Sequence, residues 1–281
     1  MKTVSIFILV FAVLSLNVFS QSKSKPVHHK VYKSLDEALK NPDEVFKLDL
    51  SIQELTKLSP EIGKLKNLEY LSLEQNKLTS LPSEIKKLKK LKTLKLKRNQ
   101  RLQLPDELWK LKNLEMLTIS KIQLKELPAG IGKLKNLKHL DLFCNQLSTL
   151  PPEIGELKNL EFTNMGNNKG IVLPEEFAEL TALKKMFMVN TKMTKLPEKF
   201  HQLKNLEELS LRSCNYKELP ASLNHLPKLR VLDIRKNQLE SWPETSPDFP
   251  SLKVLRIEEN QLDETTIERI KTQFPDVKVF E

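Results

Sequence analysis

Few side chains in this sequence have the types and spacing that catalysis or metal binding requires. Five histidines and two cysteines are scattered over 281 residues. They form no zinc-type Cys/His spacing, no HExxH motif and no GxSxG turn. Six glycines are too few for an enzyme rich in phosphate-binding loops. The sequence therefore predicts no enzyme, no cofactor, no metal site and no small-molecule substrate.

The individual histidines do not change this prediction. His28 and His29 lie in a polar N-terminal stretch and could hold an adventitious metal ion only. His139 lies in "HLDLFCNQL" without the carboxylate and nucleophile that a catalytic histidine needs. Most acidic residues stand at the expected starts of short helices, where they suit the helix dipole.

The elements that position every side chain come from an internal repeat, which is the first feature to look for in a sequence. One position holds leucine, or tryptophan in the last case, every 23 residues without interruption. Proline follows this position directly in eight units. The residues at this position are Leu58, Leu81, Leu104, Leu127, Leu150, Leu173, Leu196, Leu219 and Trp242. No 23-residue unit can bury its leucines alone, so the period predicts a stack of like coils with one continuous core.

Each unit has two halves with different periods. The Leu-x-Leu half alternates as a strand does, and the half written LPxEIGxL has helical spacing. Its proline fits the first position of a helix, and the glutamate that follows fits the positive helix end.

With the unit LPxEIGxLKNLxxLxLxxNxL, the chain resembles leucine-rich repeat proteins of the 23-residue class. That class includes exported bacterial proteins and the Ras-associated repeat proteins of eukaryotes. The resemblance covers residues from about 35 to 262. It implies an α/β fold, a right-handed solenoid or horseshoe with a parallel concave sheet of about ten strands. Short helices or turns would form the convex side.

A ladder of asparagines follows the buried leucines and requires polar partners. An unpaired amide there would cost about 1–3 kcal/mol, so each side chain is expected to bond the backbone of its own and adjacent coils. The ladder is Asn76, Asn99, Asn145, Asn168, Asn237 and Asn260, with gaps at Gln53, Ile122, Thr191 and Cys214. Cys214 is therefore expected to be a buried structural thiol.

The pattern also divides the chain. Residues 1–20 have the lysine, apolar stretch and small residues of a signal peptide, with Gln21 as the mature N-terminus; an uncleaved membrane anchor is the alternative. Residues 21–57 are expected to form a polar segment, an N-terminal cap and a first strand. The repeats would span residues 58–262, and a C-terminal cap residues 263–281, which leaves no room for a catalytic domain. The expected location is the periplasm, the cell surface or the medium.

The cysteines fit this location without forming a disulfide. Cys144 and Cys214 lie three repeats apart, which at strand spacing is roughly 14 Å. A disulfide needs Cα atoms within about 7 Å, so we expect no bond between them.

Strand alternation turns one set of apolar residues away from the leucines. These residues are contiguous over the middle strands: Met116, His139, Phe143, Phe162, Phe187 and Val189. Exposed clusters of this composition are typical of interaction sites, which predicts a protein-binding surface flanked by Lys97, Arg212 and Arg235. The alternative is that the rings pack against one another. The irregular stretch "EFTNMGNNKG" could also kink and bury Phe162.

The net charge of +10 raises a second hypothesis. Residues 86–101 hold nine basic and no acidic side chains, and lysines recur at one phase: Lys66, Lys89, Lys112, Lys135, Lys158 and Lys204. This lysine column could bind an anionic glycan or lipid surface, or could only keep a leucine-rich body soluble. Nucleic acid is not expected as a partner, because no base-stacking motif accompanies the basic run.

Overall fold

The computed structural model describes residues 30–193 and 195–281. The predicted signal peptide and most of the polar segment after it therefore lie outside the described residues. The chain divides into two units, Met1–Lys30 and Val31–Glu281. The second unit is described here by itself.

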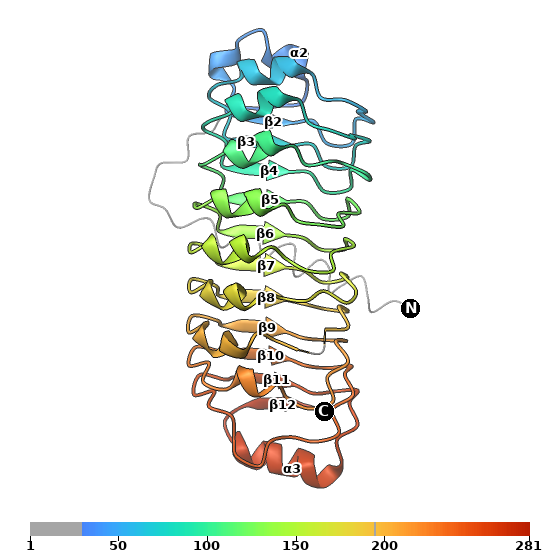
Figure 1. Cartoon of the computed structure of the whole chain (residues 1–281), viewed down its shortest axis with the longest axis vertical. Helices are drawn as coiled ribbons and strands as arrows, with labels where there is room; N and C mark the ends of the chain where they lie inside the picture. The colour runs from blue at the N-terminus through green and yellow to red at the C-terminus, as the bar shows by residue number, and fades with distance from the viewer. Residues whose placement is uncertain (1–29, 194) are drawn as a thin grey trace. The chain divides into compact units, whose positions relative to one another are not determined.

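Its main element is one parallel sheet in which the strands follow one another in sequence order, from β1 to β12 (Figure 1). The strands are β1 (Val31–Tyr32), β2 (Lys47–Asp49), β3 (Tyr70–Ser72), β4 (Thr93–Lys95), β5 (Met116–Thr118), β6 (His139–Asp141), β7 (Phe162–Asn164), β8 (Lys185–Phe187), β9 (Glu208–Ser210), β10 (Val231–Asp233), β11 (Val254–Arg256) and β12 (Lys278–Phe280). The repeat supplies β2 to β11, as expected. β12 is the expected terminal strand. β1 was not expected, and it adds to the edge by pairing Val31 with Lys47.

Short 3-10 turns form the other side of the coils. They are Pro42–Glu44, Pro60–Lys64, Ser83–Lys87, Asp106–Lys110, Ala129–Lys133, Pro152–Glu156, Glu175–Glu179, Glu198–Gln202 and Ala221–Leu223. The predicted position of the repeated proline was wrong by one residue. Pro82, for example, is extended (φ −67°, ψ 151°) and precedes its turn as the N-cap. Its fixed φ suits an extended residue as well as a helical one, so the ring does not by itself mark the first helical position.

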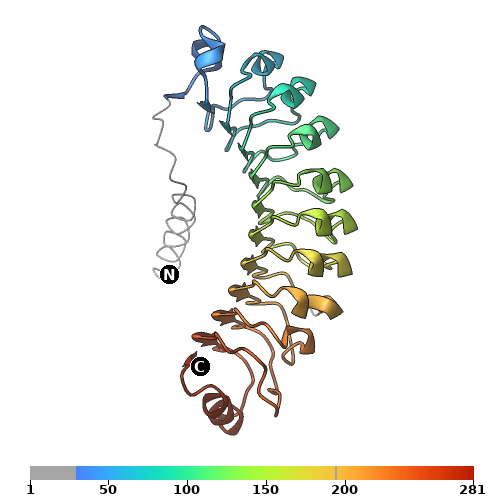
Figure 2. The ribbon, with the colours of Figure 1, turned by 90° about the vertical axis from the view of Figure 1, so that its left-hand side faces the viewer.

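The core lies between the sheet and the turns. Leucines of the Leu-x-Leu strands, such as Leu140 and Leu142, are fully buried, and so are most leucines of the convex half. Figure 2 shows the coils of this unit as an arc with the sheet on its inner, concave side and the turns on its outer side. One apolar cluster extends from Tyr32 in the first coil to Phe274 in the last.

The asparagine ladder joins each coil to the one before it. The Asn145 amide donates to the carbonyls of Leu142 in its own coil (2.9 Å) and Ile119 in the preceding coil (2.9 Å). Its oxygen accepts from the backbone N–H groups of Ile122 and Leu124 (3.1 Å each). The predicted role of these asparagines is confirmed.

The gaps at Thr191 and Cys214 are filled by other donors. The Thr191 hydroxyl donates to the Met188 carbonyl (2.9 Å), and the Cys214 sulfur lies 3.1 Å from that same carbonyl oxygen. Cys214 is fully buried, and this burial raises the pKa of its thiol. It is the structural thiol that the sequence predicted. Both cysteines are free.

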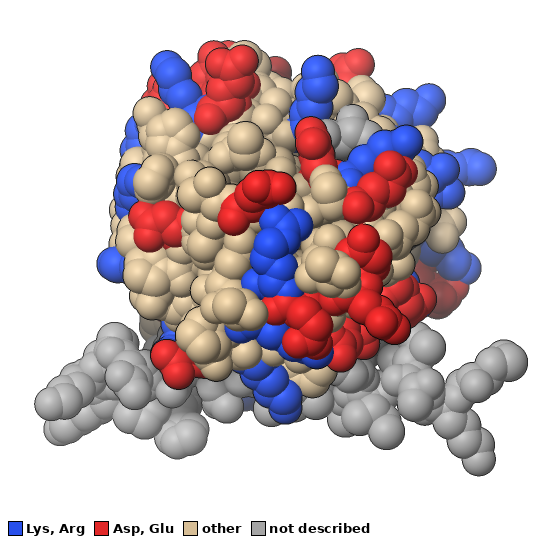
Figure 3. Space-filling view, turned by 90° about the horizontal axis from the view of Figure 1, so that it is seen from below, with Lys and Arg blue, Asp and Glu red and all other residues tan. Residues whose placement is uncertain are grey.

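Two caps close the stack. Helix α2 (Leu35–Ala38) begins after Ser34, whose side chain accepts from the Glu37 N–H. Helix α3 (Glu264–Gln273) begins after Asp263, which accepts from the Thr266 N–H at 2.7 Å, and it buries Ile270. The end of the molecule that carries α3 presents both signs of charge among other residues (Figure 3). Such a surface keeps the last coil from stacking on another.

One convex contact departs from the repeat in two places at once. In three coils, those of Gly63, Gly132 and Gly155, the glycine packs against the glutamate of the next coil. Here a buried Trp109 takes the glycine position, and Gly130 takes the glutamate position of the next coil. A Cβ at residue 130 would lie 2.2 Å from the Trp109 ring, so the large and small residues are exchanged as a pair.

We expect this pair to be energetically coupled. Gly130→Glu, which restores the repeat, should overpack the site and lower the free energy of unfolding by about 1–3 kcal/mol. Trp109→Gly should leave a cavity and cost about 3–5 kcal/mol. The double variant rebuilds the ordinary Gly–Glu contact, so its loss should be clearly smaller than the sum. Urea denaturation of the four proteins measures this; additive losses would contradict it.

Candidate functional site

The concave face consists of three rows of side chains, because the strands pair without slip. Met116, His139 and Phe162 are register partners in the first row. Asn164 pairs with Phe187 in the second row. The residues of the third row come just after each strand in the sequence. Backbone hydrogen bonds between neighbouring coils continue at this row, where Lys121 N–H donates to the Phe143 carbonyl at 3.0 Å.

The six predicted apolar residues lie together on this face. We call Met116, His139, Phe143, Phe162, Phe187 and Val189 the central patch. All six side chains are half-buried, and none belongs to the leucine core. The expected outward orientation therefore agrees with the structure, while binding of a partner here stays a prediction.

Three of the rings also pack against one another. The His139 ring stacks on Phe162 with centroids 4.1 Å apart and planes 6° apart. Phe162 in turn contacts Phe187, with centroids 5.6 Å apart. Self-packing and outward orientation thus occur together. The suggested kink is absent: Thr163 and Met165 occupy leucine positions and are buried, and β7 stays in register.

Phe143 lies apart from this stack in the third row. Its ring leans on Gly166, where an added Cβ would come within 3.2 Å of the Phe143 ring. The Lys121 ammonium lies 5.8 Å from the ring centroid, a cation–π distance. The backbone N–H of Phe143 donates to Asp141 (3.0 Å), which holds the start of the turn.

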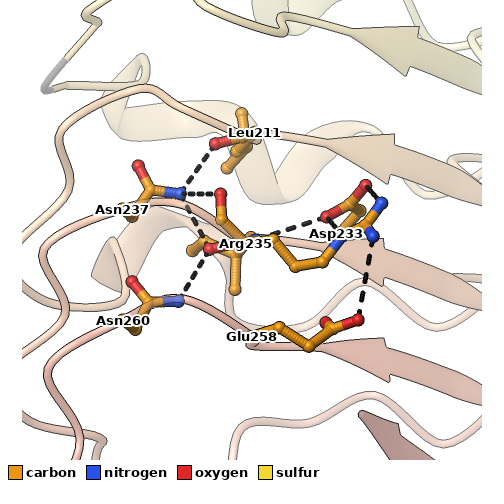
Figure 4. Close-up of polar contacts among 7 residues, drawn as sticks. Leu211, Asp233, Arg235, Asn237, Glu258 and Asn260 are labelled. Atoms are coloured by element: carbon orange, nitrogen blue, oxygen red, sulfur yellow. Dashed lines mark hydrogen bonds and ion pairs between the residues drawn. The ribbon is translucent and has the colours of Figure 1, made fainter. Parts of the chain in front are cut away.

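The flanking cations differ in how far they are neutralised. Arg235 donates two hydrogen bonds to the Asp233 carboxylate (2.9 and 2.8 Å) and lies 3.7 Å from Glu258 (Figure 4). This arrangement raises the pKa of Arg235. Lys97 and Arg212 form no ion pair within residues 30–193 and 195–281. The buried Arg212 Nε has no hydrogen-bond partner there either.

The lysine column is exposed along its whole length. Lys135 pairs with Glu156, and Lys158 pairs with Glu179 at 2.7 Å. Lys204 donates to the His225 carbonyl. Its N-terminal members Lys66, Lys89 and Lys112 have no ion pair in the described part of the chain.

A second charged ladder was missed by the sequence analysis. Just before the strands, glutamate and lysine alternate from coil to coil: Glu69, Lys92, Glu115, Lys138, Glu161 and Lys184. They form three separate pairs between neighbouring coils: Glu69–Lys92 at 3.0 Å, Glu115–Lys138 at 2.8 Å and Glu161–Lys184 at 2.8 Å. The signal was present as a 46-residue period of alternating charge. Exposed pairs contribute little stability, so the ladder mainly cancels charge along this edge.

Among the described residues, no group of three His, Cys, Asp or Glu side chains could hold a metal ion. A groove of about 430 Å³ lies at the charged edge, between Glu69 and Lys138, and is lined by lysine, glutamate and asparagine. None of its lining residues belongs to the central patch. Among the described residues no helix has the length and apolar character needed to cross a bilayer.

His139 should make stability depend on pH. Burial, and to a lesser extent the nearby Lys95, lowers the pKa of His139 from 6.5 to about 4. Between these values the unfolded chain binds a proton that the folded chain does not bind. Stability should therefore fall as the pH drops from about 6.5 to about 4 and level off below.

His139→Gln should remove this part of the pH dependence, which we expect to be about 1–2 kcal/mol for a half-buried ring. Urea denaturation at several pH values between 7 and 4 measures it. An equal slope in both proteins would contradict the assignment.

The chain was compared with known proteins by sequence and by structure. A sequence search among curated proteins found no significant match. Internalin inlF from Listeria monocytogenes has a similar fold, with a TM-score of 0.70, 22% identity, and coverage of 80% of this chain and 66% of that one. The ectodomain of the plant receptor kinase GASSHO1/SCHENGEN3 from Arabidopsis thaliana, in complex with CASPARIAN STRIP INTEGRITY FACTOR 2, has a TM-score of 0.61, 25% identity and coverage of 83% and 32%. TLR13 in its complex with ssRNA13 has a TM-score of 0.70, 27% identity and coverage of 83% and 36%.

This chain thus spans about two thirds of the internalin and about a third of the two receptors. The family itself is shown by sequence. The model of the leucine-rich repeat region matches residues 39–126, 108–209 and 129–246, which together cover more than half of the chain. The protein belongs to the leucine-rich repeat family.

Proposed function

We propose that this protein is an exported, non-enzymatic recognition scaffold that binds a protein partner through the central patch of its concave sheet. Export rests on the signal-peptide pattern of residues 1–20. The boundaries at residues 57 and 262 between caps and repeats belong to the same proposal. The mature protein would act at the cell surface, in the periplasm or in the medium.

The observation that carries the proposal is the position of the apolar side chains. The ends of the concave face are polar and charged, with Lys47, Asp49 and Ser51 at one end and Arg256 and Glu258 at the other. Aromatic residues and methionine cluster in the middle strands, whereas Tyr70 and Phe280 lie singly near the ends, each close to a cation. Such residues are enriched in the centres of protein interfaces, and charged ones are depleted there.

The rigidity of the patch supports the same conclusion. Phe162 is held between His139 and Phe187, and Phe143 is held against Gly166. A surface whose rings are already ordered loses little side-chain entropy on binding. The receptor ectodomain named above was solved in complex with CASPARIAN STRIP INTEGRITY FACTOR 2, which is consistent with use of the fold for recognition.

Phe143→Glu combined with Phe187→Glu should abolish capture of the partner from a cell-surface protein fraction. The melting temperature of the variant should stay nearly unchanged. Each change places a charge where apolar contact is needed, but neither ring belongs to the leucine core. Pull-down and thermal unfolding measure the two effects.

The matched control is Val231→Glu with Val254→Glu, two half-buried concave positions near the C-terminal end. It should retain capture. If the phenylalanine variant melts far lower than this control, the rings are structural and the proposed surface is wrong.

A second candidate function is attachment to an anionic glycan or lipid surface through the lysine column. It is favoured by Lys66, Lys89 and Lys112, which are exposed and form no ion pair with the described residues. The pairs formed by Lys135 and Lys158 weaken the C-terminal part of the column.

Salt separates the two functions. Attachment through lysines should weaken steeply between about 50 and 300 mM salt, because exposed charges are screened over a Debye length of about 10 Å at 0.1 M. Capture through the central patch should change far less. Sedimentation with anionic vesicles and pull-down, each over this salt range, measure the difference. Salt-insensitive vesicle binding would contradict the role of the column.

A further inference from the structure

The third concave row has a simple chemical order. From β4 to β9 it reads Lys97, Ser120, Phe143, Gly166, Val189 and Arg212. Backbone bonds keep the row aligned, because the residue after one member donates to the carbonyl of the next member. Cys144 N–H donates to the Gly166 carbonyl at 2.8 Å, and Asn190 N–H donates to the Arg212 carbonyl at 2.8 Å. A cation stands at each end, and apolar or small residues stand between them. Five strand spacings separate the ends, about 24 Å.

The two end cations have no anionic partner within the described coils. Lys97 forms no ion pair there, and the Arg212 Nε is buried without an acceptor. Their neighbour Arg235 is different, because Asp233 and Glu258 already neutralise it. Two further lysines, Lys95 and Lys121, lie over the rings of Tyr70 and Phe143 and do not meet a carboxylate.

Two acidic side chains face the concave side from β4 to β9. Glu208 is bonded to Lys185 at 2.6 Å. Asp141 accepts from the backbone of Phe143 and lies in the middle of the patch. The ends of the row therefore attract anions, whereas Asp141 places a carboxylate near its middle. Like charges brought together at an interface are strongly unfavourable, so this distribution selects among partners.

Building on the proposed function, we propose that the segment recognised by the central patch is an extended acidic peptide. One acidic group would meet Lys97 and another Arg212, with large apolar side chains between them over Phe143 and Val189. An extended chain advances about 3.3 Å per residue, so the two acidic groups would stand about seven residues apart. The residues between them would lack acidic side chains because of Asp141.

The test is selection from a phage-displayed library of random dodecapeptides on the purified full chain. We expect enriched peptides to carry two acidic residues six to eight positions apart with an aromatic or aliphatic residue between them. For a synthetic peptide of that sequence, Lys97→Gln and Arg212→Gln should each weaken binding about tenfold, as expected for a hydrogen bond to a charged group. Lys47→Gln, a concave lysine on β2, is the matched control and should leave the affinity unchanged.

Other outcomes overturn the inference. Selected peptides of neutral or basic composition, no selectable peptide, or equal affinity of all three lysine and arginine variants would each contradict an acidic segment. Phe143→Glu separates this failure from failure of the proposed function. If neutral peptides are selected and Phe143→Glu abolishes their binding, recognition by the patch stands and only its acidic specificity is wrong. If bound peptides ignore Phe143→Glu, both fail.

Discussion

The backbone hydrogen bonds between successive coils are the constraint on which the rest of the structure depends. Each strand has only two or three residues, so a strand pair alone provides few bonds. The asparagine side chains add bonds to the preceding coil, as Asn237 does to the Leu211 carbonyl at 2.9 Å (Figure 4). A slip of one residue would turn leucines outward and break these bonds together. Register is therefore fixed in every coil, and the direction of each side chain is fixed with it.

Because register is fixed, each charged side chain lies beside the side chain at the same repeat position in the neighbouring coil. On the edge before the strands, Glu115 meets Lys138 and Glu161 meets Lys184, so charge is cancelled between neighbours. On the concave face near the C-terminal end, Arg235 is cancelled by Asp233 and Glu258. The middle of the concave face has no such ladder. Several apolar rings cluster there, and Lys97 and Arg212 beside them pair with no carboxylate of the described coils.

Much of the fold could be predicted because the repeat keeps its period. The position of a residue within the 23-residue repeat determines its burial and its hydrogen-bond partners. The structure agrees with the burial expected for Leu140 and with the backbone bonds expected for Asn145. The same reasoning placed Phe143 outside the core. It missed β1, because Val31 and Tyr32 precede the first repeat and only their pairing with β2 makes them a strand.

The details of the candidate site depend on side-chain contacts that the position of a residue within the repeat does not determine. The stacking of His139 on Phe162 depends on side-chain rotamers. Arg235 was expected to face a partner, yet its guanidinium binds Asp233; the i, i+2 spacing of the two residues was a signal for this. The exchange of Trp109 with Gly130 could be found only by comparing the glycine position of one coil with the glutamate position of the next coil.

The most direct test of the account replaces Phe143 by a photoreactive phenylalanine analogue. Illumination of the protein with its surface fraction should give a covalent adduct from this position and none from Val254, which faces the same side near the C-terminal end. An adduct from Val254 alone, or none from position 143, would contradict the claim that the middle of the concave sheet is where the partner binds.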